Sequence, residues 1–179
     1  MQRWIALLRA INVGGHTVKM DRLRTLFGEL GLANVETFIA SGNVIFEAPS
    51  ERAAQLTGEI EEHLKHSLGY AVTTFLRTPE ELAGVANYQP FPLEEKGSDA
   101  PALYVAFLTT TPSPAAQKAL LAFRNEIDDF YIQGREVYCL ARRNLGASTF
   151  SGAALEKTLG LPATMRNITT VRKLAAKYP

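Results

Sequence analysis

The chain has 179 residues, of which 46% are hydrophobic and 21% are charged, a balance that fits a folded globular protein and excludes extensive disorder. Its 19 lysines and arginines nearly cancel its 18 aspartates and glutamates, so the formal net charge is +1. The single cysteine, Cys139, excludes an intramolecular disulfide and a cysteine-rich zinc site.

The first half of the chain carries the signals of strand, helix, strand, strand, helix, strand, which is the ferredoxin-like order. The apolar run from Trp4 to Leu8 predicts a buried strand. It is too short to cross a membrane and no signal-peptide pattern precedes it, so we expect a cytoplasmic protein with no membrane partner. The predicted elements are a strand at 4–8, a helix at 21–30, strands at 35–40 and 43–47, a helix at 50–68, a strand at 71–76 and a further helix from the capping box at 78–81.

The same pattern begins again after residues 89–100, where prolines and charged residues replace the periodicity and predict a linker. We therefore predict an α+β protein with a first ferredoxin-like unit at 1–88 and a second at 101–179. The second unit is expected to contain a strand at 103–108, a helix at 113–123, a hairpin of 126–132 and 136–140, a helix from Ser148 or Ser151 to Gly160, a weakly indicated strand near 163–166 and a last helix from 167 or 169.

Two segments of the halves resemble each other and indicate a tandem duplication with antiparallel sheets. Phe38 to Phe46 lies over Phe130 to Tyr138 at an offset of 92, and both following helices end in Leu-Gly. The central strands are almost continuous apolar runs, which predicts burial on both faces. Helices can cover only one face, so the other is expected to meet the second sheet or, in a homodimer, a partner subunit.

Features present in one copy only are the better candidates for function. Gly14-Gly15 follows a strand and precedes a helix, with Arg9 and Lys19 on either side, a setting in which backbone N–H groups can hold an anion. The spacing matches no nucleotide-binding fingerprint, and paired glycines also make simple turns. Ser41 and Asn43 are read in the same two ways, as ligand contacts or as ordinary turn residues.

The basic residues cluster at both ends of the chain. Residues 1–25 hold five basic residues and one acidic residue, and residues 140–179 hold seven and one. Such clusters favour a small anionic ligand, nucleic acid or an acidic protein face. Arginines at strand ends either bind such anions or satisfy carbonyl groups of the fold. The predicted ligand-binding residues are Arg9, Asn12, Gly14, Gly15, Lys19, Ser41, Asn43, Arg166 and Lys173.

These residues favour a binding module for a small anionic ligand held in a basic cleft, with phosphorylated molecules among the candidate ligands. The alternatives are a nucleic-acid-binding protein that uses the basic termini, or an enzyme on an anionic substrate, although no recognisable catalytic dyad or triad is present. His63 and His66 lie three residues apart beside Glu62, but their helix face is polar and lacks further ligands, so no metal and no cofactor are expected.

The chain resembles an uncharacterised, mostly bacterial family, domain of unknown function 1697. The resemblance rests on Leu8-Arg9-Ala10-Ile11-Asn12-Val13-Gly14-Gly15, on Thr37 to Phe46, and on pieces near the end that include Leu155 to Gly160 and Ala163 to Asn167. It covers nearly the whole chain. It implies a two-part α+β protein and no established activity.

Overall fold

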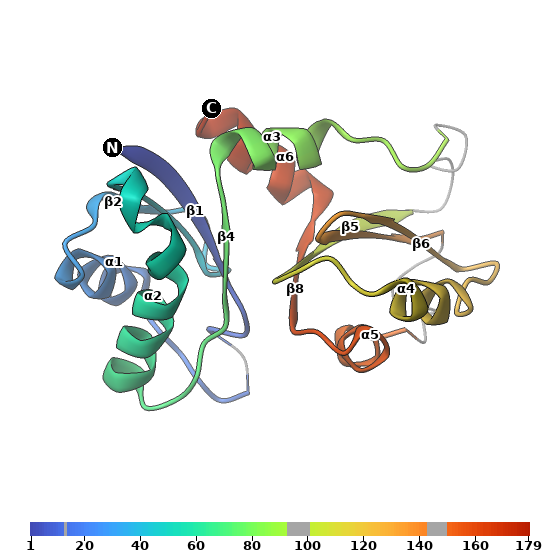
Figure 1. Ribbon diagram of the computed structural model, residues 1–179, viewed down its shortest axis with the longest axis horizontal. Helices are drawn as coiled ribbons and strands as arrows, with labels where there is room; N and C mark the ends of the chain where they lie inside the picture. Colours follow the sequence, from blue (N-terminus) through green and yellow to red (C-terminus); the bar gives the residue numbers. More distant parts are fainter. Residues whose placement is uncertain (13, 93–100, 143–149) are drawn as a thin grey trace. The chain divides into compact units, whose positions relative to one another are not determined.

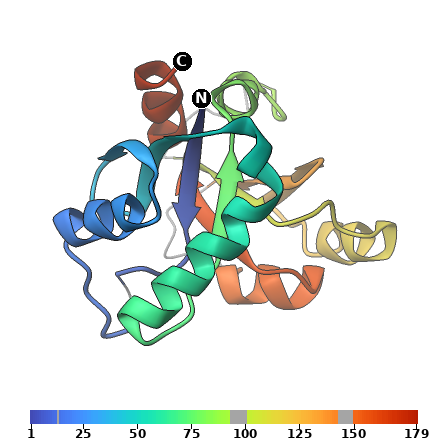
Figure 2. The same cartoon turned by 60° about the vertical axis from the view of Figure 1, so that its left-hand side comes forward.

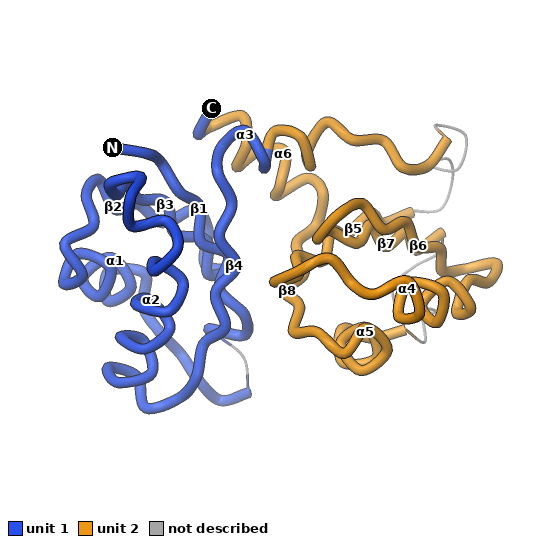
Figure 3. Tube along the Cα trace, viewed as in Figure 1, with its two compact units in different colours: residues 1–82, 178–179 blue, residues 83–177 orange. Residues whose placement is uncertain are grey.

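The computed structural model describes residues 1–12, 14–92, 101–142 and 150–179. Two compact units are present: unit 1 comprises residues 1–82 with 178–179, and unit 2 comprises residues 83–177 (Figure 3). Each unit contains one four-stranded antiparallel sheet, which confirms the predicted α+β fold of two βαββαβ units. Within the described ranges, no helix is both long and apolar enough to cross a bilayer.

Unit 1 follows the ferredoxin-like order. Its elements are β1 (Gln2–Leu8), α1 (Met20–Glu29), β2 (Ala33–Thr37), β3 (Asn43–Ala48), the 3-10 turn η1 (Ser50–Arg52), α2 (Ala53–Leu68) and β4 (Thr74–Arg77). The strand order is β2-β3-β1-β4, and every neighbouring pair is antiparallel. Both α1 and α2 lie against one face of this sheet (Figures 1 and 2).

Unit 2 repeats the arrangement with the order β6-β7-β5-β8. The weakly indicated last strand does form, and it pairs with its neighbour over five residues. After α3 (Pro79–Asn87), which begins in unit 1, the elements are β5 (Ala102–Leu108), α4 (Pro114–Leu121), β6 (Asp128–Gln133), β7 (Glu136–Ala141), α5 (Gly152–Leu159), β8 (Ala163–Asn167) and α6 (Ile168–Lys177).

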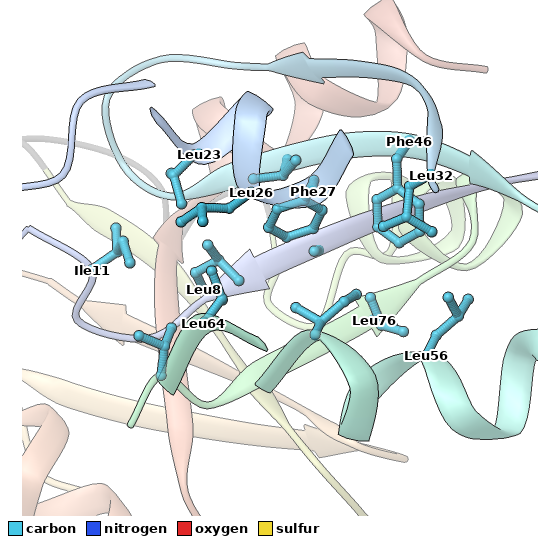
Figure 4. Close-up of a cluster of buried hydrophobic side chains, with 14 of the residues drawn as sticks. Leu8, Ile11, Leu23, Leu26, Phe27, Leu32, Phe46, Leu56, Leu64 and Leu76 are labelled. Carbon is cyan, nitrogen blue, oxygen red and sulfur yellow. The ribbon is translucent and has the colours of Figure 1, made fainter. Parts of the chain in front are cut away.

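Alternating residues of the central strands face the helices of their own unit. In unit 1, Leu8 and Phe46 meet Leu23, Leu26 and Phe27 of α1, and the rings of Phe27 and Phe46 lie 5.6 Å apart (Figure 4). The intervening residues of β1 are buried as well: Ile5 is 0% and Leu7 is 1% exposed. The strands are therefore buried on both faces, as the continuous apolar runs predicted.

The second strands of the two hairpins, β3 and β7, are equivalent at an offset of 93, one more than the sequence comparison indicated. Leu8 N donates to Gly42 O at 2.8 Å, and Leu108 N donates to Arg135 O at 2.9 Å, so Gly42 corresponds to Arg135. Under the predicted offset Phe46 would match Tyr138, but Phe46 faces α1 whereas Tyr138 lies on the opposite face of its own sheet. A shift of one residue reverses the face of every side chain in a strand, so the offset decides which residues of the two units are equivalent.

Some element limits differ from those predicted for local reasons. The strand predicted at 35–40 ends at Thr37, because Phe38 begins a turn and Ile39 has a φ of +50°. The strand predicted from 71 begins at Thr74.

The compact units also divide the chain differently from the predicted domains. Residues 83–88 group with unit 2, where Tyr138 Oη donates to Val85 O at 3.1 Å and Arg172 Nε to Ala86 O at 3.4 Å. Residues 178–179 group with unit 1, where Tyr178 Oη donates to Glu36 Oε2 at 2.8 Å. Most of the predicted linker, residues 93–100, lies outside the described residues, as does Ser148.

Candidate functional site

The described residues between β1 and α1, 9–12 and 14–19, are tied to the turn between β2 and β3, residues 38–42. We call these segments the glycine loop and the hairpin turn. Asn12 joins them: its Oδ1 accepts from Val18 N at 2.6 Å and its Nδ2 donates to Ala40 O at 3.4 Å. Asn12 thus closes the glycine loop on itself and holds it against the hairpin turn.

The hairpin turn is held from inside by Asn43, which is 0% exposed. Its Nδ2 donates to Phe38 O at 3.0 Å and to Ser41 Oγ at 2.8 Å. Gly42 has a φ of +74°, and a Cβ at this position would lie 2.7 Å from Ile11 Cγ2. Only glycine therefore lets the turn approach the glycine loop this closely.

Gly14 and Gly15 form the exposed tip of the glycine loop. Both have positive φ values, +65° and +84°, and a Cβ on either would meet no atom within 4 Å. Their backbone is therefore open to solvent. Lys19 follows at the start of α1, where it occupies the N-cap position without making a side-chain cap.

The other helices of the fold, apart from α2, begin with a side-chain cap. Ser113 Oγ accepts from Ala116 N at the start of α4, and Ser151 Oγ accepts from Ala154 N at the start of α5. Thr78 and Glu81 form the predicted capping box of α3: Glu81 N donates to Thr78 Oγ1 at 3.2 Å, and Thr78 N donates to Glu81 Oε2 at 2.9 Å. Helix α2 continues from a 3-10 turn that precedes it. The first amide groups of α1 are thus left without the usual side-chain acceptor, next to the glycine loop.

Most of the N-terminal positive charge is paired with carboxylates. Arg3 lies 3.4 Å from Glu47 and Arg22 lies 3.6 Å from Glu29. Arg24 pairs with Asp21, which lies in the first turn of α1. Lys19 forms no ion pair with any residue in the described ranges. Arg9, exposed at the end of β1, is the other cation within the glycine loop.

An aromatic pair that no local sequence pattern indicates also supports the glycine loop. The rings of His16 and Tyr70 stack with centroids 3.8 Å apart and planes at 19°. Tyr70 Oη donates to Ile11 O at 3.3 Å, and burial raises the pKa of this hydroxyl. Tyr70 follows α2, 54 residues after His16, so only the fold brings the two rings together.

Arg166 and Lys173, the remaining predicted site residues, belong to unit 2. Arg166 is buried, and its Nη1 donates to Thr164 Oγ1 at 2.8 Å and to Met165 O at 2.9 Å. Arg77 of unit 1 makes the equivalent bond to Leu76 O at 2.8 Å. Burial lowers the pKa of Arg166 to about 10. These contacts favour the structural reading of the strand-end arginines, whereas Lys173 is exposed on α6.

The remaining candidates have local partners. His63 Nε2 lies 2.9 Å from Glu29 Oε2, and the described part of the chain contains no cluster of three potential metal ligands. Cys139 packs against the core of unit 2, and burial raises the pKa of its thiol to about 12.

The similarity of the chain to known proteins agrees with this picture of a fold without an assigned activity. A model of the family described as "Protein of unknown function (DUF1697)" matches residues 1–138. The chain belongs to the DUF1697 family. Its fold is similar to that of a solved structure described as conserved bacterial protein SP0830 from Streptococcus pneumoniae, with a TM-score of 0.71 and 23% identity over 99% of this chain and 98% of that one. No curated protein matches the chain.

For this member of DUF1697, the similarities confirm the fold and the family. They carry no ligand, substrate or partner. Any function must therefore be argued from the residues that the fold brings together.

Proposed function

We propose that the glycine loop of unit 1 binds a small anionic ligand through its backbone amides and its two cations. The observation that carries the proposal is the uncapped start of α1, which lies at the end of a loop containing Gly14, Gly15, Arg9 and Lys19. Amide groups at a helix start carry partial positive charge and attract anions. A phosphate or carboxylate oxygen is the acceptor that this position lacks.

The internal bonds of the loop support the proposal because they fix its shape before a ligand arrives. Asn12, Tyr70 and Gly42 each hold the backbone from a different side. A loop that is already ordered loses little conformational entropy on binding. In this account Asn12, Ser41 and Asn43 position the loop, while Arg9, Gly14, Gly15 and Lys19 contact the ligand.

One feature sets an upper limit on the affinity. Asp21 lies in the first turn of α1 and contributes negative charge where an anion would bind, but Arg24 pairs with its carboxylate. Arg9 and Lys19 bring two positive charges to the loop, which match a ligand with two negative charges, such as a phosphate monoester, better than a single carboxylate.

A thermal-shift titration with inorganic phosphate and phosphate monoesters tests the proposal. We expect saturable stabilisation of the full chain, and Arg9→Ala should weaken the apparent affinity roughly tenfold or more, because a charged hydrogen bond contributes about 1.5–3 kcal/mol. Lys118→Ala is the matched control, since Lys118 is an exposed cation on α4, the equivalent helix of unit 2. A melting temperature that stays constant across a broad panel of anions would contradict the proposal.

A further inference from the structure

Strand β6 lies at the edge of the unit 2 sheet, so half of its backbone groups point away from the sheet. Residues of odd number bond to β7, a pattern that continues before the strand, where Arg142 N donates to Ile127 O at 2.8 Å. The N–H and C=O groups of Asp128, Phe130 and Ile132 therefore point outward. Such a row is the surface to which another strand can be added.

Side chains and one backbone N–H of unit 2 already occupy most of these outward groups. Asn125 takes both groups of Asp128: its Oδ1 accepts from Asp128 N at 2.8 Å, and its own N–H donates to Asp128 O at 2.9 Å. At Phe130, the N–H donates to Asp129 Oδ1 at 2.8 Å and the carbonyl accepts from Arg124 Nη2 at 2.9 Å. Of the outward residues, Ile132 beside the hairpin loop is the one whose backbone bonds to none of the described residues.

Arg124 and Asp129, whose side chains bond to the backbone of Phe130, also form an ion pair with each other. Arg124 Nε lies 2.7 Å from Asp129 Oδ1, and Arg142 Nη2 lies 2.8 Å from Asp129 Oδ2. The Asp129 side chain is only 19% exposed, so this network is less screened than an ordinary surface pair. Together Arg124 and Asp129 form a clamp over the centre of the β6 edge.

The corresponding edge strand of unit 1, β2, is protected by an irregular backbone rather than by side chains. Strand β2 has a register shift between Ala33 and Glu36, and Asn34 within it has a φ of +50°. A bulge of this kind interrupts the row of backbone groups and discourages strand addition. Strand β6 has a regular register over all six residues, so its outward groups form an unbroken row, covered by contacts from Arg124, Asn125 and Asp129.

We propose that the β6 edge is a pairing surface for a second copy of this chain, and that the Arg124–Asp129 clamp holds it closed. Antiparallel pairing about Tyr131 would join the outward groups of Phe130 to those of Ile132 in the second copy. In this register Asp129 faces Gln133 rather than another carboxylate, so a second copy fits without opposed charges. The clamp occupies the Phe130 groups that the pairing requires.

The test is the molar mass of the folded chain, measured by light scattering after size exclusion. Arg124→Ala combined with Asp129→Ala should double the mass relative to the wild-type chain at high protein concentration. Lys118→Ala combined with Glu126→Ala is the charge-matched control and should leave the mass unchanged, since both residues are exposed. Adding Ile132→Pro to the first pair removes the remaining outward N–H and should restore the wild-type mass.

A folded clamp variant, judged by circular dichroism, that keeps the wild-type mass would overturn the proposal. So would an association that survives Ile132→Pro, because that association would not be strand pairing. Should the double variant not fold, Arg124→Ala combined with Asp129→Asn keeps an acceptor for Phe130 N–H and opens only the carbonyl. This milder variant should show a smaller but measurable rise in mass, and an unchanged mass would count against the proposal.

Discussion

The first helix begins differently in the two units, although both units share one topology. In unit 2, β5 reaches α4 through residues 109–113, and Ser113 caps the helix. In unit 1, β1 reaches α1 through the longer segment 9–19, which contains two exposed glycines and leaves α1 without a side-chain cap. Because unit 2 folds with the short capped connection, the fold itself does not require the glycine loop.

The hairpins support the same conclusion once the correct offset is used. Gly42 corresponds to Arg135, which carries a full side chain, so the hairpin position does not require glycine in both copies. Gly42 is required in unit 1 because Ile11 of the glycine loop packs against it. The buried arginines Arg77 and Arg166, by contrast, make the same bond in both units and belong to the shared fold.

The largest effect is expected from Gly42→Ala. Positive φ costs a residue with a Cβ about 1–2 kcal/mol, and crowding in a packed region costs about 1–3 kcal/mol, so the free energy of unfolding should fall by about 2–5 kcal/mol. Gly134→Ala is the matched control: its φ is +59° and the nearest atom to an added Cβ is Glu136 Oε2 at 3.9 Å. Denaturant unfolding should show a loss of only about 1–2 kcal/mol for the control. Equal losses would mean that contact with the glycine loop is unimportant.

Removing the side-chain cap of α4 and adding one to α1 should each have an intermediate effect on stability. Ser113→Ala removes the cap of α4 and should lower stability by about 1 kcal/mol. Lys19→Ser offers α1 the cap it lacks and should raise stability by about 0.5–1 kcal/mol while weakening phosphate binding. Lys19→Ala separates the two causes, because it removes the charge without adding a cap. If Lys19→Ser binds phosphate as tightly as the wild-type chain, the start of α1 is not the anion site.

The smallest effect concerns Cys139 in unit 2. Because burial raises its pKa from the usual 9 to about 12, the folded chain keeps the thiol protonated where the unfolded chain has lost the proton. Near neutral pH this group changes stability little, whereas its contribution should decline as pH rises from about 9 to 12. Reaction with a disulfide reagent at pH 8 should be slow in the folded chain and fast in denaturant. Rapid reaction of the folded chain would show that the thiol is accessible.

The sequence predicted much of the fold because its signals are local. The capping residues Thr78 and Ser151 and the helix-ending Gly69 and Gly160 lie where expected. Local signals could not reveal the hairpin offset. Gly42 and Gly134 match by residue type, but in the folded sheets Gly42 occupies the position of Arg135. The faces of the strands reveal that shift, and they are known only after the sheet has formed.

The sequence predicts which residues of the candidate site are neighbours, but not which of them hold the loop in place. Gly14, Gly15, Arg9 and Lys19 are neighbours along the chain, so their proximity follows from the sequence. The bonds of Asn12 to Ala40 and of Tyr70 to Ile11 join residues 28 and 59 positions apart, and no local pattern indicates them. The burial of Asn43 and Arg166 likewise depends on packing between elements distant in sequence.

Amide chemical shifts of the ¹⁵N-labelled chain, followed during titration with inorganic phosphate, would show whether an anion binds at the start of α1. We predict saturable shifts at Gly14, Gly15 and the first-turn residues Met20 and Asp21, with little change at the Ser113 end of α4. Shifts confined to unit 2, or no saturable shift in either unit, would contradict an anion site at the start of α1.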